Sequence, residues 1–245
     1  MYTVLTVVRY PKLLSWAGFF SMAFFRLPLM FNKRLTFYKL MGCGKNGSFS
    51  VVPDVRQWAI LVSTDKKDLR DLINNPNTVY GKFINGWWRL FKTEQWTLVL
   101  DPIEGHGKWD GKEAFGSLPR NTSYEGTIAV LTRATIRLSR LKNFWQNVDK
   151  AAAPLQGSEG FIQSIGIGEV PWKKQATFSM WQSKQAMKNY AYRAHQHNDV
   201  IHKTRKENWY SEEMFVRFRV LSSHGTLPAH ATILPHLKQV GTTEQ

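Results

Sequence analysis

The feature of this sequence that most constrains the fold is an internal repeat. Phe37–Gly44 (FYKLMGCG) and Phe161–Gly168 (FIQSIGIG) share the pattern F-x-x-x-(M/I)-G-x-G at a spacing of 124 residues. Two further matches share a spacing of 118 residues, namely Leu61–Leu72 with Ser179–Tyr190, and His106-Gly107 with His224-Gly225. Self-similarity at a fixed spacing is typical of duplicated architectures, so the chain is predicted to contain two copies of one unit.

Each half has the same predicted order: strand, helix, two strands, helix, strand. In the first half the elements are Thr3–Arg9, Leu13–Phe31, Leu35–Met41, Ala59–Ser63, Lys66–Asn74 and Trp96–Leu100. In the second half they are Thr127–Thr132, Leu138–Ala151, Phe161–Gly166, Ala176–Met180, Ser183–Lys203 and Met214–Val220. This order is that of the split β-α-β, ferredoxin-like unit. We therefore predict an α+β fold of two tandem ferredoxin-like units packed sheet to sheet.

Composition shifts along the chain suggest the limits of these units. The first unit is expected over residues 1–115 and the second over 127–230, with a linker at 116–126 and a tail at 231–245. The stretch Glu113–Gly126 is rich in Gly, Ser, Pro and Asn, as a connection should be. The glycine pairs of the repeat lack the third glycine and the following helix of a dinucleotide fingerprint, so they are predicted to end strands.

The charge of the chain favours anionic partners. It carries 33 basic and 18 acidic residues, a net charge of +15, and the surplus is spread evenly over both halves. Nucleic acid, anionic lipid and an acidic redox protein are all compatible with such a surface. No strand has the glycine–aromatic pattern of an RNA-recognition motif, which argues against nucleic acid. The single Cys43 excludes an internal disulfide and any cysteine-built zinc or iron–sulfur site.

The most apolar stretch is Ser15–Phe31 (SWAGFFSMAFFRLPLMF). A spanning helix needs about 20 apolar residues, and Arg26 and Pro28 interrupt this one. We interpret it as an ordinary core helix. The alternative is a docking face for a membrane or an apolar ligand. The expected location is the cytoplasm, with peripheral contact with the inner membrane.

Three of the seven histidines fall in AYRAHQHNDVIHKTR, on the predicted helix Ser183–Lys203. At 100° per residue, His197 falls inside the apolar stripe of this helix, whereas His195 and His202 fall at its edge. Two interpretations remain open for His197: a hydrogen-bonded core histidine, or a ligand to a metal or haem. The equivalent first-half residue is Val79, so the repeated fold does not require a histidine there. Lys203 and Arg205 could meet haem propionates or form a solvated helix end.

The region around these histidines resembles the spheroidene monooxygenase family. The resemblance is strongest over Thr177–Phe218, in F-S-x-W-x-S at Phe178–Ser183, the aromatic–histidine stretch Tyr192–His197, and W-Y-x-E-E-x-F-x-R-F at Trp209–Phe218. That family consists of haem-dependent carotenoid oxygenases related to dimeric α+β-barrel haem proteins. The resemblance implies a barrel of that kind, with haem b iron held by His197 and His195 as the alternative ligand. It identifies no catalytic residue.

The activity implied by the resemblance is a monooxygenation. Oxygen from O₂ would be inserted into a spheroidene-like carotenoid, with electrons from a ferredoxin-type donor. A basic surface suits an acidic ferredoxin. The alternative function is a non-catalytic protein that binds haem or another apolar ligand with tandem ferredoxin-like units. The colour of the purified protein and product formation with a reductant would distinguish these functions.

Overall fold

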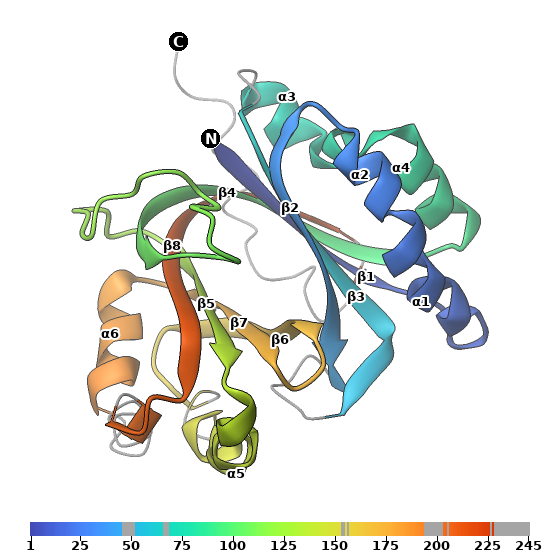
Figure 1. Cartoon of the computed structure of the whole chain (residues 1–245). Helices are drawn as coiled ribbons and strands as arrows, with labels where there is room; N and C mark the ends of the chain where they lie inside the picture. Colours follow the sequence, from blue (N-terminus) through green and yellow to red (C-terminus); the bar gives the residue numbers. More distant parts are fainter. Residues whose placement is uncertain are drawn as a thin grey trace.

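Eight antiparallel strands form one closed barrel in the order β1-β3-β2-β6-β7-β5-β8-β4 (Figure 1). The structure is a computed structural model, and it describes residues 1–45, 52–65, 69–152, 155, 157–193, 203–204, 206–225 and 227. Closure pairs both edges of every strand, which removes the open edges that attract other chains.

The first half of the chain forms β1 (Tyr2–Arg9), η1 (Lys12–Leu14), α1 (Ser15–Phe24), α2 (Arg26–Met30), β2 (Leu35–Gly44), β3 (Pro53–Thr64), α3 (Leu69–Asn74), η3 (Pro76–Tyr80), α4 (Gly81–Leu90) and β4 (Glu94–Gly107). The second half forms β5 (Ile128–Ile136), η4 (Leu138–Arg140), α5 (Leu141–Ala152), β6 (Phe161–Val170), β7 (Lys174–Trp181), α6 (Lys184–Arg193) and β8 (Tyr210–Gly225). The η elements are short 3-10 helices.

The predicted order of elements agrees with the structure, with two differences in the first half. The helix predicted at Leu13–Phe31 is divided at Phe25, where α1 ends and α2 begins. Pro28 explains the division, because a proline is tolerated only in the first turn of a helix, and α2 begins two residues before it. The second difference is α4, a helix for which no element was predicted.

Alternate side chains of the strands fill the barrel, which has an apolar interior. The interior cluster includes Leu5, Leu61, Leu98, Leu131, Ile165 and Phe178. The segment after β4 closes one end, because Trp109, Ala114 and Phe115 are buried in the same cluster. These residues end the predicted first unit, and Leu118 of the predicted linker packs against the same cluster.

The two halves are joined edge to edge. Strand order is β4-β1-β3-β2 within the first half and β8-β5-β7-β6 within the second, with seams at β2–β6 and β4–β8. At the β4–β8 seam His106 pairs with Phe215 and Thr97 pairs with His224. The predicted spacing of 118 relates one pair to the other, because it matches His106 with His224 and Thr97 with Phe215. At β3 and β7 the predicted match of Leu61 with Ser179 is wrong. Leu61 points into the barrel, whereas Ser179 lies on the outer face, where its hydroxyl accepts a hydrogen bond from the indole of Trp181.

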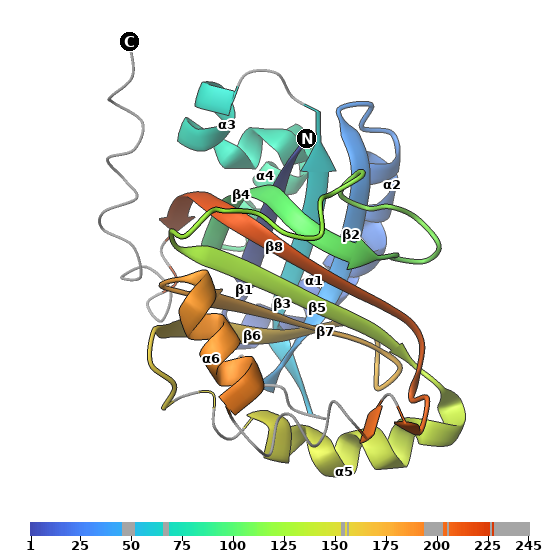
Figure 2. The same cartoon turned by 90° about the vertical axis from the view of Figure 1, so that its left-hand side faces the viewer.

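Helices cover two opposite outer faces of the barrel. α1, α2 and α4 pack on the sheet of the first half, and α5 and α6 lie on the other side, over the sheet of the second half (Figures 1 and 2). Each sheet thus has one face in the shared interior and one beneath its own helices.

Candidate functional site

The two outer faces are covered to different extents. In the first half, Thr6 of β1 pairs with Thr97 of β4, and both are almost fully buried. Their hydroxyl oxygens lie 2.9 Å apart, and the hydroxyl of Tyr80 donates a hydrogen bond of 2.8 Å to Thr6. Tyr80 and Val79 lie in η3, which therefore covers the middle of this face.

The corresponding pair in the second half is exposed. Thr132 of β5 pairs with Phe215 of β8, at the place in the sheet that Thr6 and Thr97 occupy in the first half. Thr132 is exposed and Phe215 is half-buried. The strip between α6 and α5 on this face, which we call the open strip, is the strongest candidate site in the described part of the chain.

Apolar side chains bound the open strip on both sides. Beneath α6, Met187 and Tyr190 pack on Ile128, Val130 and Trp181. The rings of Tyr190 and Trp181 are 5.2 Å apart, and burial raises the pKa of Tyr190 to about 12, so this phenol stays neutral at physiological pH. At the α5 side the cluster consists of Ile136, Phe144 and Trp209, with Leu141, Trp145 and Tyr210 against it.

A polar group borders the strip along β4 and β8. The ring of His106 stacks on Phe215 with centroids 5.9 Å apart, and the guanidinium of Arg217 lies 4.6 Å from the centre of the same ring. Arg217 forms an ion pair with Glu104, which is fully buried, and burial lowers the pKa of Arg217. Phe215 thus contacts both an imidazole and a guanidinium.

The carboxylate of Glu104 also fixes the start of α6. The ammonium of Lys184, which is 4% exposed, lies 2.8 Å from Glu104 and also donates to Asn121 Oδ1 at 2.6 Å and to the carbonyl of Thr122 at 2.7 Å. The first residue of α6 is therefore tied both to β4 and to the segment that connects the two halves.

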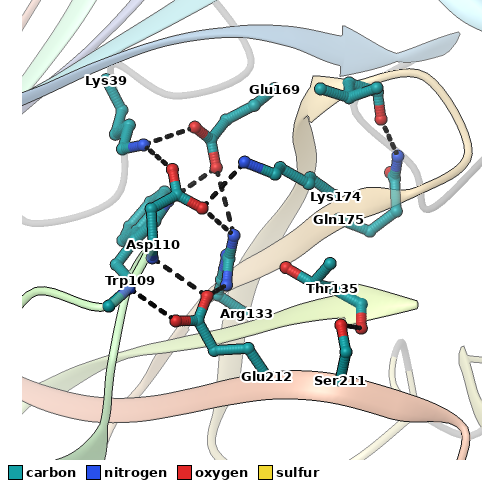
Figure 3. Close-up of polar contacts among 12 residues, drawn as sticks. Lys39, Trp109, Asp110, Arg133, Thr135, Glu169, Lys174, Gln175, Ser211 and Glu212 are labelled. Carbon is teal, nitrogen blue, oxygen red and sulfur yellow. Dashed lines mark hydrogen bonds and ion pairs between the residues drawn. The ribbon is translucent and has the colours of Figure 1, made fainter. Parts of the chain in front are cut away.

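A second cluster of charges lies inside the barrel at the end closed by Trp109 (Figure 3). Arg133, which is 1% exposed, pairs with Glu212, Asp110 and Glu169. Lys39 pairs with Asp110 and Glu169, and Lys174 pairs with Asp110. The three cations and three carboxylates pair with one another, so this cluster closes the barrel.

Two carboxylates of this interior cluster, those of Asp110 and Glu212, have a lowered pKa. Burial alone would raise the pKa of Asp110, but hydrogen bonds from Lys174 and Lys39 and the charges of Lys39 and Arg133 lower it to about 2. For Glu212, amide hydrogen bonds from Gly111 and Asp110 and the bond and charge of Arg133 also outweigh burial and lower the pKa.

Most of the residues predicted to hold the cofactor lie outside the described residues. They are His197, its alternative His195, and Arg205. Lys203 is described: its side chain is exposed, and its ammonium lies 5.9 Å from the ring of Trp209, at the α5 side of the open strip. Among the described residues no group of three His, Cys, Asp or Glu side chains could hold a metal ion.

Sequence reasoning missed several residues that shape the open strip. In the sequence His106 stands out only as part of a repeated His-Gly pair, and Glu104 and Lys184 belong to no motif. Strand alternation could have placed Glu104 and His106 on one face. It could not show that Lys184, 80 residues later, reaches the same face, because that contact depends on tertiary structure.

Known proteins similar to this chain point to one family. No protein-family profile matches the chain. The spheroidene monooxygenase of Rhodobacter capsulatus is 34% identical over 205 residues, which cover 82% of each chain. That of Cereibacter sphaeroides is 30% identical over 203 residues, covering 82% of this chain and 60% of the relative. That of Rubrivivax gelatinosus is 32% identical over 189 residues, covering 77% and 70%.

Among solved structures, the fold is similar to that of aldoxime dehydratases. The complex of the aldoxime dehydratase OxdRE with butyraldoxime has a TM-score of 0.59 at 7% identity, over 95% of this chain and 84% of the other. A second aldoxime dehydratase has a TM-score of 0.57 at 9% identity, over 96% and 88%. At such identities the similarity establishes the fold alone.

Proposed function

The chain belongs to the spheroidene monooxygenase family and is a carotenoid monooxygenase, and we propose that it inserts oxygen from O₂ into a spheroidene-like carotenoid. The observation that carries this proposal is the match to the Rhodobacter capsulatus enzyme over most of both chains. We further propose that the two halves are ferredoxin-like units of a dimeric α+β-barrel type. Their matching strand orders and the two seams support this.

The proposed cofactor is haem b, bound over the open strip with His197 as the iron ligand. The first half supports this placement. Its residue at the 118-residue spacing, Val79, lies in η3 beside Tyr80, which bonds to Thr6. A residue placed equivalently in the second half would lie over Thr132 and Phe215. The imidazole of His197 is the donor that haem iron requires at such a position.

The described residues fit a haem at this place. A porphyrin needs an apolar wall, and Phe215 and the clusters beneath α5 and α6 provide one. Its two propionates need cations, and exposed Lys203 lies at the edge of the strip, with Arg205 two residues later. When bound, haem supplies O₂ binding and cleavage of the O–O bond.

The residues of the chain have three tasks in this reaction. Lys184 and Glu104 hold the start of α6 and so position the segment that carries His197. Apolar side chains at the strip exclude water from the cofactor and contact the polyene. His106 lies beside Phe215, and its imidazole would bind or move a proton at the edge of the site.

The remaining proposals concern partners and location. Electrons would come from an acidic ferredoxin-type protein, because the chain carries a net charge of +15. The protein would be cytoplasmic and in peripheral contact with the inner membrane, where its lipophilic substrate dissolves.

The haem proposal is tested by spectra of the purified full-length protein, with and without dithionite. Wild type should show a Soret band and about one haem per chain. His197→Ala should lose the band, while His195→Ala and His202→Ala, the matched controls, should keep it. A His197→Ala protein with full haem content would refute the assignment of the ligand.

The enzymatic activity is tested separately. Holoprotein, reduced ferredoxin and detergent-dispersed spheroidene should give a product that contains one ¹⁸O atom when the reaction runs under ¹⁸O₂. A protein that binds haem but never forms this product would be a haem carrier instead.

A further inference from the structure

Helix α1 has its bulky apolar side chains on the outside. The residues that face the barrel are small: Ala17, Gly18 and Ser21 are buried. A Cβ atom on Gly18 would lie only 2.4 Å from Nε1 of Trp58, so the helix packs closely on the barrel. A surface helix of a soluble protein normally turns its large apolar residues inward. The prediction of an ordinary core helix is therefore wrong for the outer side of α1, where Trp16 is 51% and Phe19 is 67% exposed.

The exposed apolar surface extends over three helices. We define the aromatic face as Leu13, Trp16, Phe19, Phe20, Phe24, Leu27, Met30, Phe31, Phe83 and Leu90, all exposed. Rings on α1 contact rings on or beside α4: Trp16 lies 5.5 Å from Phe91, and Phe24 lies 5.6 Å from Trp87. The apolar surface of α1 is thus continuous with that of α4. Large continuous apolar patches on soluble proteins mark interaction sites.

The helical segments that carry the aromatic face have charged side chains of one sign only. Residues 11–34 and 76–92 contain no aspartate or glutamate, and they contain seven basic residues: Lys12, Arg26, Lys33, Arg34, Lys82, Arg89 and Lys92. At the α2–α4 end a hollow of about 280 Å³ is lined by Arg34 and Lys82 together with Phe31 and Phe83. Cations therefore border the apolar side chains closely.

We propose that the aromatic face docks on the surface of an anionic phospholipid bilayer, with α1 in the plane of the interface. Trp and Phe side chains partition into the interfacial region, and lysine and arginine attract anionic headgroups. A second copy of the chain is a poorer occupant, because a symmetric interface would bring two sets of cations together.

Docking on the surface suits this helix better than crossing the bilayer. One helical stretch of the described residues, Lys12–Met30, is long and apolar enough to cross a membrane by length and composition alone. Its inner side, however, is packed on β3 and neighbouring strands through Ala17, Phe25 and Leu29. Crossing would strip these contacts from the barrel and expose its outer sheet.

The helices that carry the aromatic face, α1, α2 and α4, lie on the opposite side of the barrel from α5 and α6 (Figures 1 and 2). A protein docked by this face would turn the open strip away from the lipid. The proposal rests on the proposed function only for the reason to visit a membrane, and its test needs neither substrate nor cofactor turnover.

The test is sedimentation of the full-length protein with vesicles. Wild type should bind vesicles of 70% phosphatidylcholine and 30% phosphatidylglycerol, and bind pure phosphatidylcholine at least about tenfold more weakly. Phe19→Ser combined with Phe24→Ser should weaken binding about a hundredfold, since each buried phenyl ring contributes about tenfold. The matched control is Leu138→Ser combined with Trp172→Ser, two exposed apolar residues outside the aromatic face, which should bind as wild type.

Lys82→Glu combined with Arg89→Glu should lose the preference for anionic vesicles, and added salt should reduce the difference from wild type. The proposal is overturned if wild type stays in the supernatant, if the Phe19/Phe24 variant binds as wild type, or if size measurements show that the aromatic face holds a dimer. Turnover of detergent-dispersed carotenoid without vesicle binding would refute docking alone. Vesicle binding without turnover would refute the proposed function alone.

Discussion

Replacing Arg133 by methionine tests whether the interior charge cluster stabilises the barrel. The guanidinium is 1% exposed and contacts three carboxylates: it pairs with Glu212, lies 2.8 Å from Asp110 and lies 3.7 Å from Glu169. Methionine fills a similar volume without the charge. The variant therefore leaves the carboxylates in place and removes their shared partner.

The expected loss follows from which carboxylates keep a cation. Asp110 and Glu169 retain Lys39, whereas Glu212 retains only the amide groups of Asp110 and Gly111 among the described contacts. Breaking a buried ion pair destabilises by about 3–5 kcal/mol. Because one carboxylate rather than three loses its cation, we expect about 3 kcal/mol, or a fall in Tm of about 6–12 °C.

The loss should depend on pH. The pKa values of Asp110 and Glu212 are lower in the folded protein than in the unfolded chain. Their ionised forms therefore stabilise the fold at any pH above the unfolded-state pKa of these carboxyl groups. This stabilisation is lost as the pH falls toward 2. For Asp110, which is a third exposed, screening leaves about 1 kcal/mol of this effect. The difference between wild type and Arg133→Met should therefore be largest at pH 6–8 and shrink below about pH 4.

The assay is urea unfolding followed by circular dichroism at several pH values. Lys174→Met is the matched control, because its ammonium is a quarter exposed and pairs with Asp110 alone among the described residues. It should lose less than about 1 kcal/mol. If Arg133→Met unfolds within about 0.5 kcal/mol of wild type at pH 7, or if its loss is the same at pH 3, the reasoning is wrong.

Three further predictions follow from the same structure. Lys184→Met should lower the free energy of unfolding by about 1–3 kcal/mol and speed haem loss to apomyoglobin, because buried Glu104 keeps Arg217 but loses its second cation, and Asn121 and Thr122 lose a donor; unchanged haem retention would contradict its positioning role. Gly18→Ala should lower stability by about 1–3 kcal/mol in thermal unfolding, since its Cβ would overlap Trp58, whereas Gly86→Ala, with open space around it, should not. Turnover with reduced ferredoxin should slow several-fold between 50 and 500 mM salt, since screening weakens steering; a rate independent of salt would exclude a charge-steered donor.

Much of the fold could be predicted from the sequence because it depends on local patterns. Alternation of apolar residues identified the strands, and the repeat fixed their order in each half. The pattern could not show that Phe115, in a Gly- and Pro-rich stretch, fills the end of the barrel. Nor could it show the one-residue shift between β3 and β7, because register depends on pairing with distant strands.

The candidate site was harder to predict. The helix periodicity correctly put Met187 and Tyr190 on the buried side of α6, but the prediction for His197 concerns residues beyond those described. The exposure of Thr132 depends on which segments cover the sheet, and the residues of the strand itself do not determine that. Its counterpart in the first half, Thr6, is fully buried, although both residues are threonines on the outer face of a strand.

The two seams that fuse the halves into one barrel also relax a constraint of symmetry. In a barrel built from two identical subunits, every substitution occurs twice, so an opening on one outer face is copied onto the other. In a fused chain a substitution occurs once. One half can keep Thr6 and Thr97 sealed beneath Tyr80, and can change its outer helices independently, while the other leaves Thr132 accessible. A barrel made from one chain thus permits its two outer faces to differ.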